Sequence, residues 1–342
     1  MNPSKCCCAS AAADPAPSID SGSIPVLSSR LTQKDIRDGW KARWGIGRMR
    51  YTVRPGLYKI NDPSADSPVL VSANYKLTVD KLRKELTSLS AWILVLDTRG
   101  INVWCAAGKG TFGTEELIRR IADVRLDQFV RHRRLILPQL GAPGVAAHEV
   151  KKQSGFAVSY GPVRAEDIPK YLRNGRRADA EMRRVRFPFR DRLALIPREL
   201  IPALRWMPVF MLWVLIVRLL GGQEWTWDYF IELAPFLAAV LTGSVLFQIL
   251  LPWLPFRSFA LGGWVLGALA AVGISWGLDA DVHRWMVHVF LLPPVTAYLA
   301  LNFTGSTPFT SLSGVQRELR ISAPLMVLSI LCGMAVQIIH IV

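Results

Sequence analysis

The sequence is poor in cysteine and histidine, the side chains that build disulfide frameworks and most zinc sites. Each occurs five times in 342 residues. The cysteines are Cys6, Cys7, Cys8, Cys105 and Cys332. Their spacing fits neither a zinc site nor a paired disulfide framework, which excludes a zinc module and a disulfide-rich secreted scaffold. Thiols that stay reduced suit a domain in the cytoplasm.

Acidic residues are also scarce. The chain has 26 Asp and Glu against 41 Lys and Arg, which gives a net charge of +15. Ten arginines and only four acids fall between Arg173 and Arg205, just before the first long apolar run. Proteins that bind single-stranded nucleic acid place aromatic residues between their cations, and this segment has few aromatic residues. The charge pattern therefore predicts no nucleic-acid partner and favours a cytoplasmic anchor on membrane lipid.

Changes in composition along the chain predict four segments. Residues 1–45 are expected to form a flexible N-terminal tail, and they lack the apolar stretch of a signal peptide. Residues 46–172 have the composition of a soluble domain. Residues 173–200 form a basic juxtamembrane linker, and residues 201–342 are predicted to form a transmembrane domain.

Residues 46–172 alternate between strand and helix signals. Strands are expected at 69–72, 92–96, 135–137 and 156–160, and helices at 79–89, 114–124, 144–154 and 165–172. Such alternation predicts a Rossmann-like α/β domain, a parallel sheet with helices on both faces. A ligand would then bind at the carboxyl ends of the strands.

The C-terminal part contains five apolar spans, each close to the roughly 20 residues that a bilayer requires. They cover residues 201–220, 229–251, 258–278, 285–301 and 322–341. Arg257, Arg317 and Arg320 fall in connections on the side of the soluble domain, which predicts a cytoplasmic head and an outside C-terminus. Arg205 and Arg218 are expected to reach the two interfaces of the first span.

The run between the strand 92–96 and the helix 114–124 has an unusual composition. It consists of Asn102, Val103, Trp104, Cys105, Ala106, Ala107, Gly108 and Lys109. Asn102 is a predicted helix N-cap, which puts Cys105 in the first turn, where free N–H groups favour a thiolate. The small residues after it would let a large flat ligand approach the backbone. From these residues alone, a buried structural cysteine is an equally good interpretation.

Two nucleotide-binding motifs are almost present. Gly108, Gly110 and Gly113 have the spacing of a dinucleotide fingerprint, but eleven residues separate them from the preceding strand and no acid ends the next one. A P-loop fails because Val103 stands at its first glycine position and Gly110 follows Lys109 in place of Ser or Thr. The sequence therefore argues against nucleotide binding.

The run 102–109 resembles the cap-helix motif Asn-(Val/Ile)-Trp-Cys-Ala-(Ala/Gly)-Gly-Lys of the membrane-bound corrinoid proteins of microbial mercury methylation. That family is related to the corrinoid iron–sulfur protein large subunit. Residues 302–311, followed by 313–315, resemble a second stretch of the same family, and so does the layout of a soluble head before a membrane domain. The resemblance covers about residues 50–342.

The resemblance implies a corrinoid-dependent methyltransferase. Its methyl group would come from a methylated folate and pass through methyl-cobalt(III) to Hg(II), giving methylmercury. The cofactor would be a cobamide, a vitamin B12-type corrinoid with Cys105 as the lower axial ligand of cobalt. The other implied contacts are Asn102, Val103, Trp104, Ala106, Ala107, Gly108, Lys109, Asn302, Thr304 and Thr307. A ferredoxin-like partner with two 4Fe–4S clusters would return cobalt to its reactive state.

A thiolate ligand agrees with what the sequence lacks. Many corrinoid proteins hold cobalt through the His of an Asp-x-His-x-x-Gly motif, and the nearest match here, Asp281-Val282-His283, has no following glycine. His132 and His148 are isolated and are expected to be structural.

Two other functions remain open from the sequence. One is a membrane corrinoid carrier of one-carbon or acetyl-CoA metabolism with a different methyl acceptor. The other is a non-enzymatic membrane protein for metal binding or transport. A transport role is disfavoured because the spans contain few ionisable residues besides Arg218, Glu232 and His288.

Overall fold

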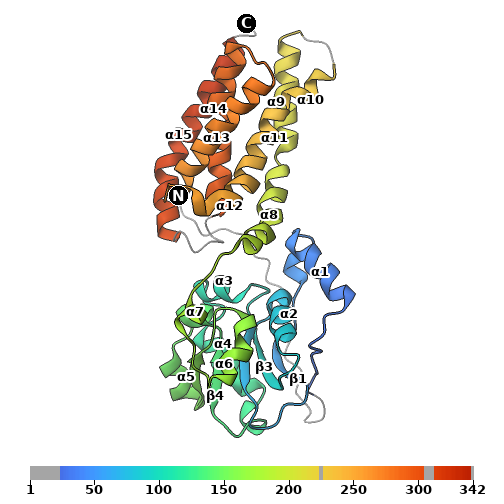
Figure 1. Ribbon diagram of the computed structural model, residues 1–342, viewed down its shortest axis with the longest axis vertical. Coiled ribbons are helices and arrows are strands. Elements are labelled where there is room, and N and C mark those ends of the chain that lie inside the picture. The colour runs from blue at the N-terminus through green and yellow to red at the C-terminus, as the bar shows by residue number, and fades with distance from the viewer. Residues whose placement is uncertain (1–23, 223–225, 304–311, 340–342) are drawn as a thin grey trace. The chain divides into compact units, whose positions relative to one another are not determined.

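The computed structural model describes residues 24–222, 226–303 and 312–339. Contacts within the chain divide it into two compact units. The first holds the described residues up to Gly39 together with Gly47–Arg184, and the second holds Trp40–Ile46 and the described residues from Val185 onward. The first unit is an α/β domain and the second is helical (Figure 1).

The first unit is built on a five-stranded sheet with the order β1-β3-β2-β4-β5. The strands are β1 (Gly56–Ile60), β2 (Val69–Ala73), β3 (Ala91–Leu96), β4 (Arg134–Leu137) and β5 (Ala157–Tyr160). The four predicted strands are present as β2 to β5 and pair in parallel. The sequence prediction missed β1, which pairs antiparallel with β3, so the sheet is mixed and not purely parallel.

Alternating residues of the central strands enter two separate cores. Val69 and Val71 of β2 pack on one face with α3 (Val103–Gly108), α4 (Thr114–Asp123) and α5 (Ala147–Ser154). Leu70 packs on the opposite face with α2 (Lys76–Glu85), α6 (Ile168–Arg173) and α7 (Ala180–Arg183). Helices therefore cover both faces, as the alternating pattern predicts.

Several helices differ in their bounds from the sequence prediction. Short 3-10 turns account for much of the difference: η1 (Arg48–Arg50), η2 (Leu126–Gln128), η3 (Gln139–Gly144) and η4 (Ala165–Asp167). The helix expected from residue 144 starts only at Ala147, because Pro143 lies in the η3 turn before it. The helix expected from residue 165 begins as η4 and becomes α-helical at Ile168.

A helix lies inside the segment that the sequence predicted as a tail. Residues Gln33–Arg43 form α1. Its first turn is closed by a reciprocal pair, in which the Asp35 N–H donates to Thr32 Oγ1 and the Thr32 N–H donates to an Asp35 carboxylate oxygen. This is the geometry of a capping box, so a local start signal for α1 was present in the sequence.

The second unit contains the long apolar helices. Its elements are α8 (Phe189–Leu204), α9 (Met207–Leu220), α10 (Asp228–Glu232), α11 (Ala234–Leu241), η5 (Thr242–Leu246), α12 (Phe247–Leu250), η6 (Leu251–Trp253), α13 (Phe259–Gly277), α14 (Val282–Asn302) and α15 (Leu312–Ile339). In agreement with the prediction, the described residues include five helical stretches long and apolar enough to cross a membrane. The first stretch starts at Phe189, so α8 occupies the end of the expected linker.

Small residues allow close packing inside the second unit. A Cβ added at Gly267 of α13 would lie 2.6 Å from the Cα of Pro293 in α14, and one at Gly263 would lie 2.7 Å from the Cα of Ala297. Arg218 lies in the last turn of α9. It is buried, and its Nη1 donates to Glu232 Oε1 at 2.9 Å, which satisfies its charge inside the unit.

Candidate functional site

The helix α3 contains the candidate motif and lies after the carboxyl end of β3. Asn102 is its N-cap, and the side-chain Oδ1 of Asn102 accepts a hydrogen bond from the Cys105 N–H at 2.9 Å. The predicted cap and the predicted place of Cys105 in the first turn are therefore confirmed. The cap satisfies one of the free N–H groups of the helix start.

The two faces of α3 have different surroundings. Val103, Ala106 and Ala107 are buried in the core between α3 and the sheet, and Ala106 is fully buried. Trp104, Gly108 and Lys109 are exposed, and Cys105 is half-buried. The outward residues are thus Trp104, Cys105, Gly108 and Lys109, at the spacing of a single helix face.

The alanines have a different role from the one that the sequence suggested. We expected Ala106 and Ala107 to let a ligand approach the backbone, but they face the protein interior. A Cβ added at Gly144, in the η3 turn after β4, would lie 3.0 Å from the Cα of Ala107. The small residues therefore let α3 approach the η3 turn closely. Gly108, by contrast, is exposed, and no atom lies within 4 Å of the position that its Cβ would take.

Asn74 organises the turn that leads into α3. It lies directly after β2 and is 5% exposed. Its Oδ1 accepts from the Thr98 N–H at 3.2 Å, the Thr98 hydroxyl at 2.8 Å and the Gly100 N–H at 2.9 Å. Its Nδ2 donates to Asp97 Oδ1 at 3.2 Å. Sequence reasoning missed Asn74, although a polar residue directly after a fully buried strand was a usable signal.

Glu116 of α4 holds the same turn from the other side. Its Oε1 accepts from the Asp97 N–H at 2.8 Å and from Arg120 Nη2 at 2.9 Å, and its Oε2 accepts from Arg119. Burial alone would raise the pKa of Glu116, but the hydrogen bonds from Asp97, Arg119 and Arg120 outweigh it and lower the pKa. The carboxylate therefore stays charged and ties the end of β3 to α4.

The three glycines of the dinucleotide-like pattern lie between two helices. Gly108 ends α3, Gly110 has a φ of 78°, and Gly113 precedes α4. A Cβ added at Gly113 would lie 2.7 Å from the carbonyl oxygen of Gly110. These glycines therefore make a tight helix-to-helix turn, whereas a dinucleotide fingerprint needs a turn from strand to helix.

The remaining predicted residues belong to other parts of the chain. Asn302 ends α14 in the second unit and is exposed. Thr304, Thr307 and the cluster Cys6, Cys7 and Cys8 lie outside the described residues.

The histidines of the first unit do not form a metal site. His132 Nε2 lies 2.8 Å from the Ser67 carbonyl oxygen, in agreement with a structural role. His148 is exposed beside Glu149, which differs from that expectation. Within the described residues, no group of three or more His, Cys, Asp or Glu could hold a metal ion.

Comparison with known proteins bears on the first unit. Residues 47–172 match the family model of the CO dehydrogenase/acetyl-CoA synthase delta subunit. The acetyl-CoA decarbonylase/synthase complex subunit gamma of Archaeoglobus fulgidus is 34% identical over 122 residues, which are 35% of this chain and 26% of that protein. The same subunit of Methanopyrus kandleri is equally similar over the same shares.

A bacterial relative is also similar. The corrinoid/iron-sulfur protein large subunit of Moorella thermoacetica is 31% identical over 123 residues, which are 35% of this chain and 27% of that protein. The chain thus spans about a quarter of the length of the curated relatives that it matches. The comparisons thus show that residues 47–172 are similar to part of these subunits, and they do not extend to mercury methylation.

Proposed function

We propose that this chain is a corrinoid-dependent methyl carrier held at a membrane. The observation that carries the proposal is α3, which presents Cys105 from a capped helix start at the carboxyl edge of the sheet. The corrinoid/iron-sulfur protein among the relatives and the match of residues 47–172 support it. The five apolar helices support the membrane location.

The outward face of α3 fits a cobamide. Cys105 offers a half-buried thiol, and its backbone N–H is already used by Asn102, so the thiol sits on a fixed turn. Gly108 lies three residues further along the same face and leaves open space beside the backbone. A broad, flat macrocycle needs such a side-chain-free approach. Cys105, Gly108, Trp104 and Lys109 are therefore the residues proposed to hold it directly.

The buried members of the motif have a supporting role in this proposal. Val103, Ala106 and Ala107 anchor α3 in the core, and Asn102 sets the start of the helix. Asn74 and Glu116 fix the turn that precedes it. The Cys105 thiolate would be a soft, strongly donating ligand for cobalt. A bound cobamide would supply the metal that accepts and releases the methyl group.

Two methyl acceptors are proposed on different grounds. The relatives support a carrier of one-carbon or acetyl-CoA metabolism more directly than a mercury methyltransferase, because their names place them in acetyl-CoA decarbonylase/synthase complexes. The complete motif at residues 102–109 favours Hg(II) by resemblance. A thiolate donor to cobalt would also favour methyl transfer to a soft electrophile such as Hg(II).

The partners and the membrane orientation belong to the same proposal. The methyl donor would be a methylated folate or a protein that carries its methyl group, and a ferredoxin-like protein with two 4Fe–4S clusters would act as reductant. Arginines near the start of α8 favour a cytoplasmic head. Asn302, Thr304 and Thr307 are proposed to face the bound cofactor from the membrane half. Replacing them with Ala should then lower methyl transfer without lowering cobamide binding.

The test is cobamide binding followed by methyl transfer. The full chain, purified in detergent and incubated with a cobamide, should retain it through gel filtration and show its absorption spectrum. Loaded protein should then pass a labelled methyl group from methylated folate to an acceptor. Supplying Hg(II) or an acetyl-CoA synthase in parallel separates the two acceptors. A chain that retains no cobamide would contradict the proposal and favour the non-enzymatic membrane protein.

A further inference from the structure

The helix α1 carries an exposed apolar stripe that the proposed methyl transfer does not use. Ile36 and Trp40 of α1 are 51% and 55% exposed, and Trp44, the first residue after α1, is 44% exposed. The three follow one another at a spacing of four residues, and the Trp44 N–H continues the helical pattern by donating to the Trp40 carbonyl oxygen. This spacing keeps them on one side of a helix. Ile46 and Met49, just beyond its end, are 64% and 66% exposed. Two tryptophans and three aliphatic side chains thus face solvent within 14 residues of sequence.

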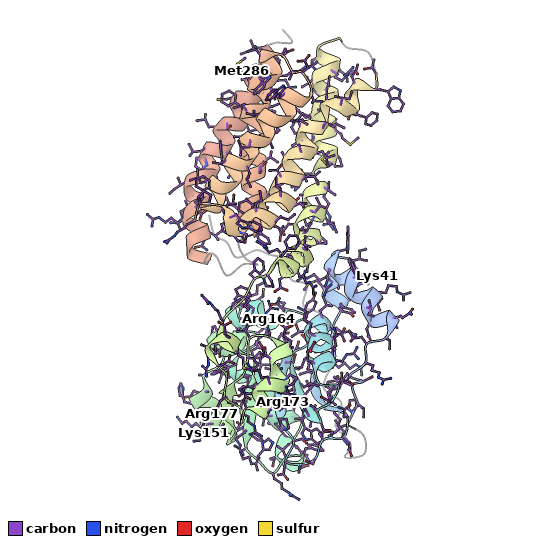
Figure 2. The ribbon with its side chains drawn as sticks, viewed as in Figure 1. Lys41, Lys151, Arg164, Arg173, Arg177 and Met286 are labelled. Carbon is purple, nitrogen blue, oxygen red and sulfur yellow. The ribbon has the colours of Figure 1, made fainter. Side chains whose placement is uncertain are left out.

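Cations border this stripe. Lys34, Arg37 and Lys41 lie next to it around the helix, and Figure 2 marks Lys41 in the last turn of α1. From residue 40 to residue 50 the sequence has four Lys or Arg and no acid. Helices that lie in the membrane–water interface typically have Trp on one face and Lys and Arg on the adjoining face.

The opposite side of α1 is bonded to α2 and Tyr51. The Asp35 carboxylate is 2.6 Å from Lys76 Nζ and 2.8 Å from Arg83 Nη2, both on α2. The Tyr51 hydroxyl donates to the Asp35 carbonyl oxygen at 3.1 Å. A Cβ added at Gly39 would lie 3.1 Å from Leu77 of α2, so the two helices approach closely there. The helix is therefore already formed and oriented before any partner binds, which lowers the entropic cost of binding.

We propose that α1 is an interfacial membrane element that inserts Ile36, Trp40 and Trp44 into the headgroup region of an anionic bilayer. The indole ring has the mixed polar and apolar character that the interface favours. Lys34, Arg37 and Lys41 would meet the lipid phosphates. The same chain has five helices suited to a membrane, so a bilayer is the partner that its composition supplies.

Photo-crosslinking of the full chain in lipid nanodiscs tests the proposal. Benzoylphenylalanine is placed at Trp40 or Trp44, and at Val26 as a control, because Val26 is an exposed apolar residue outside α1. After irradiation, lipid adducts are measured by mass spectrometry in neutral nanodiscs and in nanodiscs with phosphatidylglycerol. Adducts at positions 40 and 44 should exceed those at 26 several-fold and increase with the anionic lipid.

A charge variant sharpens the test. The triple change Lys34→Gln, Arg37→Gln and Lys41→Gln should lower the lipid-adduct yield at position 40 about fivefold or more with anionic lipid, and little with neutral lipid. Equal yields at positions 26, 40 and 44 would overturn the proposal. Adducts mainly to other residues of the chain would overturn it as well, because they would show that the stripe is covered by protein.

Discussion

Asn74 accepts a hydrogen bond from the backbone N–H of Gly100 at 2.9 Å, so a residue at the end of β2 fixes the turn that follows the neighbouring strand β3. The same Asn74 oxygen also accepts from Thr98. The path of the chain into α3 therefore depends on a buried amide outside the motif. The orientation of Cys105 is set by the sheet edge as much as by α3 itself.

Removing this amide should loosen the approach to α3. Asn74→Ala leaves the buried N–H groups of Thr98 and Gly100 without their partner, at about 1–3 kcal/mol for each group that stays unsatisfied. Hydrogen exchange should accelerate across residues 98–105. Asn61→Ala is the matched control, because the Asn61 amide bonds to the Leu86 and Leu89 carbonyls away from α3. Unchanged exchange at residues 98–105 in Asn74→Ala would show that the turn is held by other contacts.

Asn102 should control the first turn of α3. Asn102→Ala removes the cap on Cys105 and should cost about 1 kcal/mol of local stability. Asn102→Asp keeps an oxygen acceptor and should retain most of it. The direct measurement is the exchange rate of the Cys105 amide, with methyl transfer as the second readout. We expect Asn102→Ala to lower methyl transfer more than global stability. Turnover equal to that of the wild type would show that Asn102 has no role in the site.

Cys105 should determine the spectrum of a bound cobamide. If its thiolate lies below cobalt, Cys105→Ala should change the visible spectrum of the oxidised, loaded protein. Cys332→Ala, in the last helix, is the control and should leave the spectrum unchanged. An identical cobalt spectrum in wild type and Cys105→Ala would withdraw the ligand assignment, whereas loss of cobamide retention in both variants would point to a folding defect.

The local features of the candidate site could be predicted from sequence, and the long-range ones could not. The Asn102 cap acts over three residues, so its signal lies inside the motif. The direction in which Ala106 and Ala107 point depends on the η3 turn, more than 30 residues further along the chain. Alanine is equally suited to a ligand face and to close packing, so composition alone does not distinguish the two.

The missed elements have a similar explanation. The strand β1 has only five residues and pairs antiparallel at the sheet edge, where it follows no βαβ pattern. The helix α1 is more polar than apolar, so the search for a buried face passed over it although Thr32 and Asp35 signal its start. The pairing of Arg218 with Glu232 was not predicted, because the two residues are 14 positions apart and only the fold joins them.

The attachment of α1 should weaken in acid. Burial alone would raise the pKa of Asp35, but hydrogen bonds from Lys76, Thr32 and Arg83 hold it well below its usual value. A depressed folded-state pKa means that the stabilisation is fully present above the unfolded pKa of about 4 and is lost as the pH falls through the folded pKa. The protection factors of the α1 amides, which correct for the intrinsic slowing of exchange in acid, should therefore fall progressively below about pH 4.

Asp35→Asn is the variant that isolates this effect. It should accelerate exchange in α1 already at neutral pH and remove most of the additional acid dependence. Asp38→Asn changes a neighbouring acid on the same helix that is not bonded to α2, and should keep the wild-type pH profile. The same acid dependence in wild type and Asp35→Asn would show that another group holds α1 to the first unit.

Close packing of α13 against α14 should make Gly267 sensitive to a single methyl group. In Gly267→Ala the new Cβ would lie 2.6 Å from the Cα of Pro293 and 2.9 Å from the Cβ of Thr296, so the helices must separate. Overpacking of this kind costs about 1–3 kcal/mol.

Gly273, on the same helix, is the control, because no atom lies near the position of its missing side chain. Gly273→Ala should therefore be neutral or stabilising by up to about 1 kcal/mol, since alanine favours helix. Thermal unfolding of the full chain in detergent compares the two variants, and equal effects would contradict the close contact between α13 and α14.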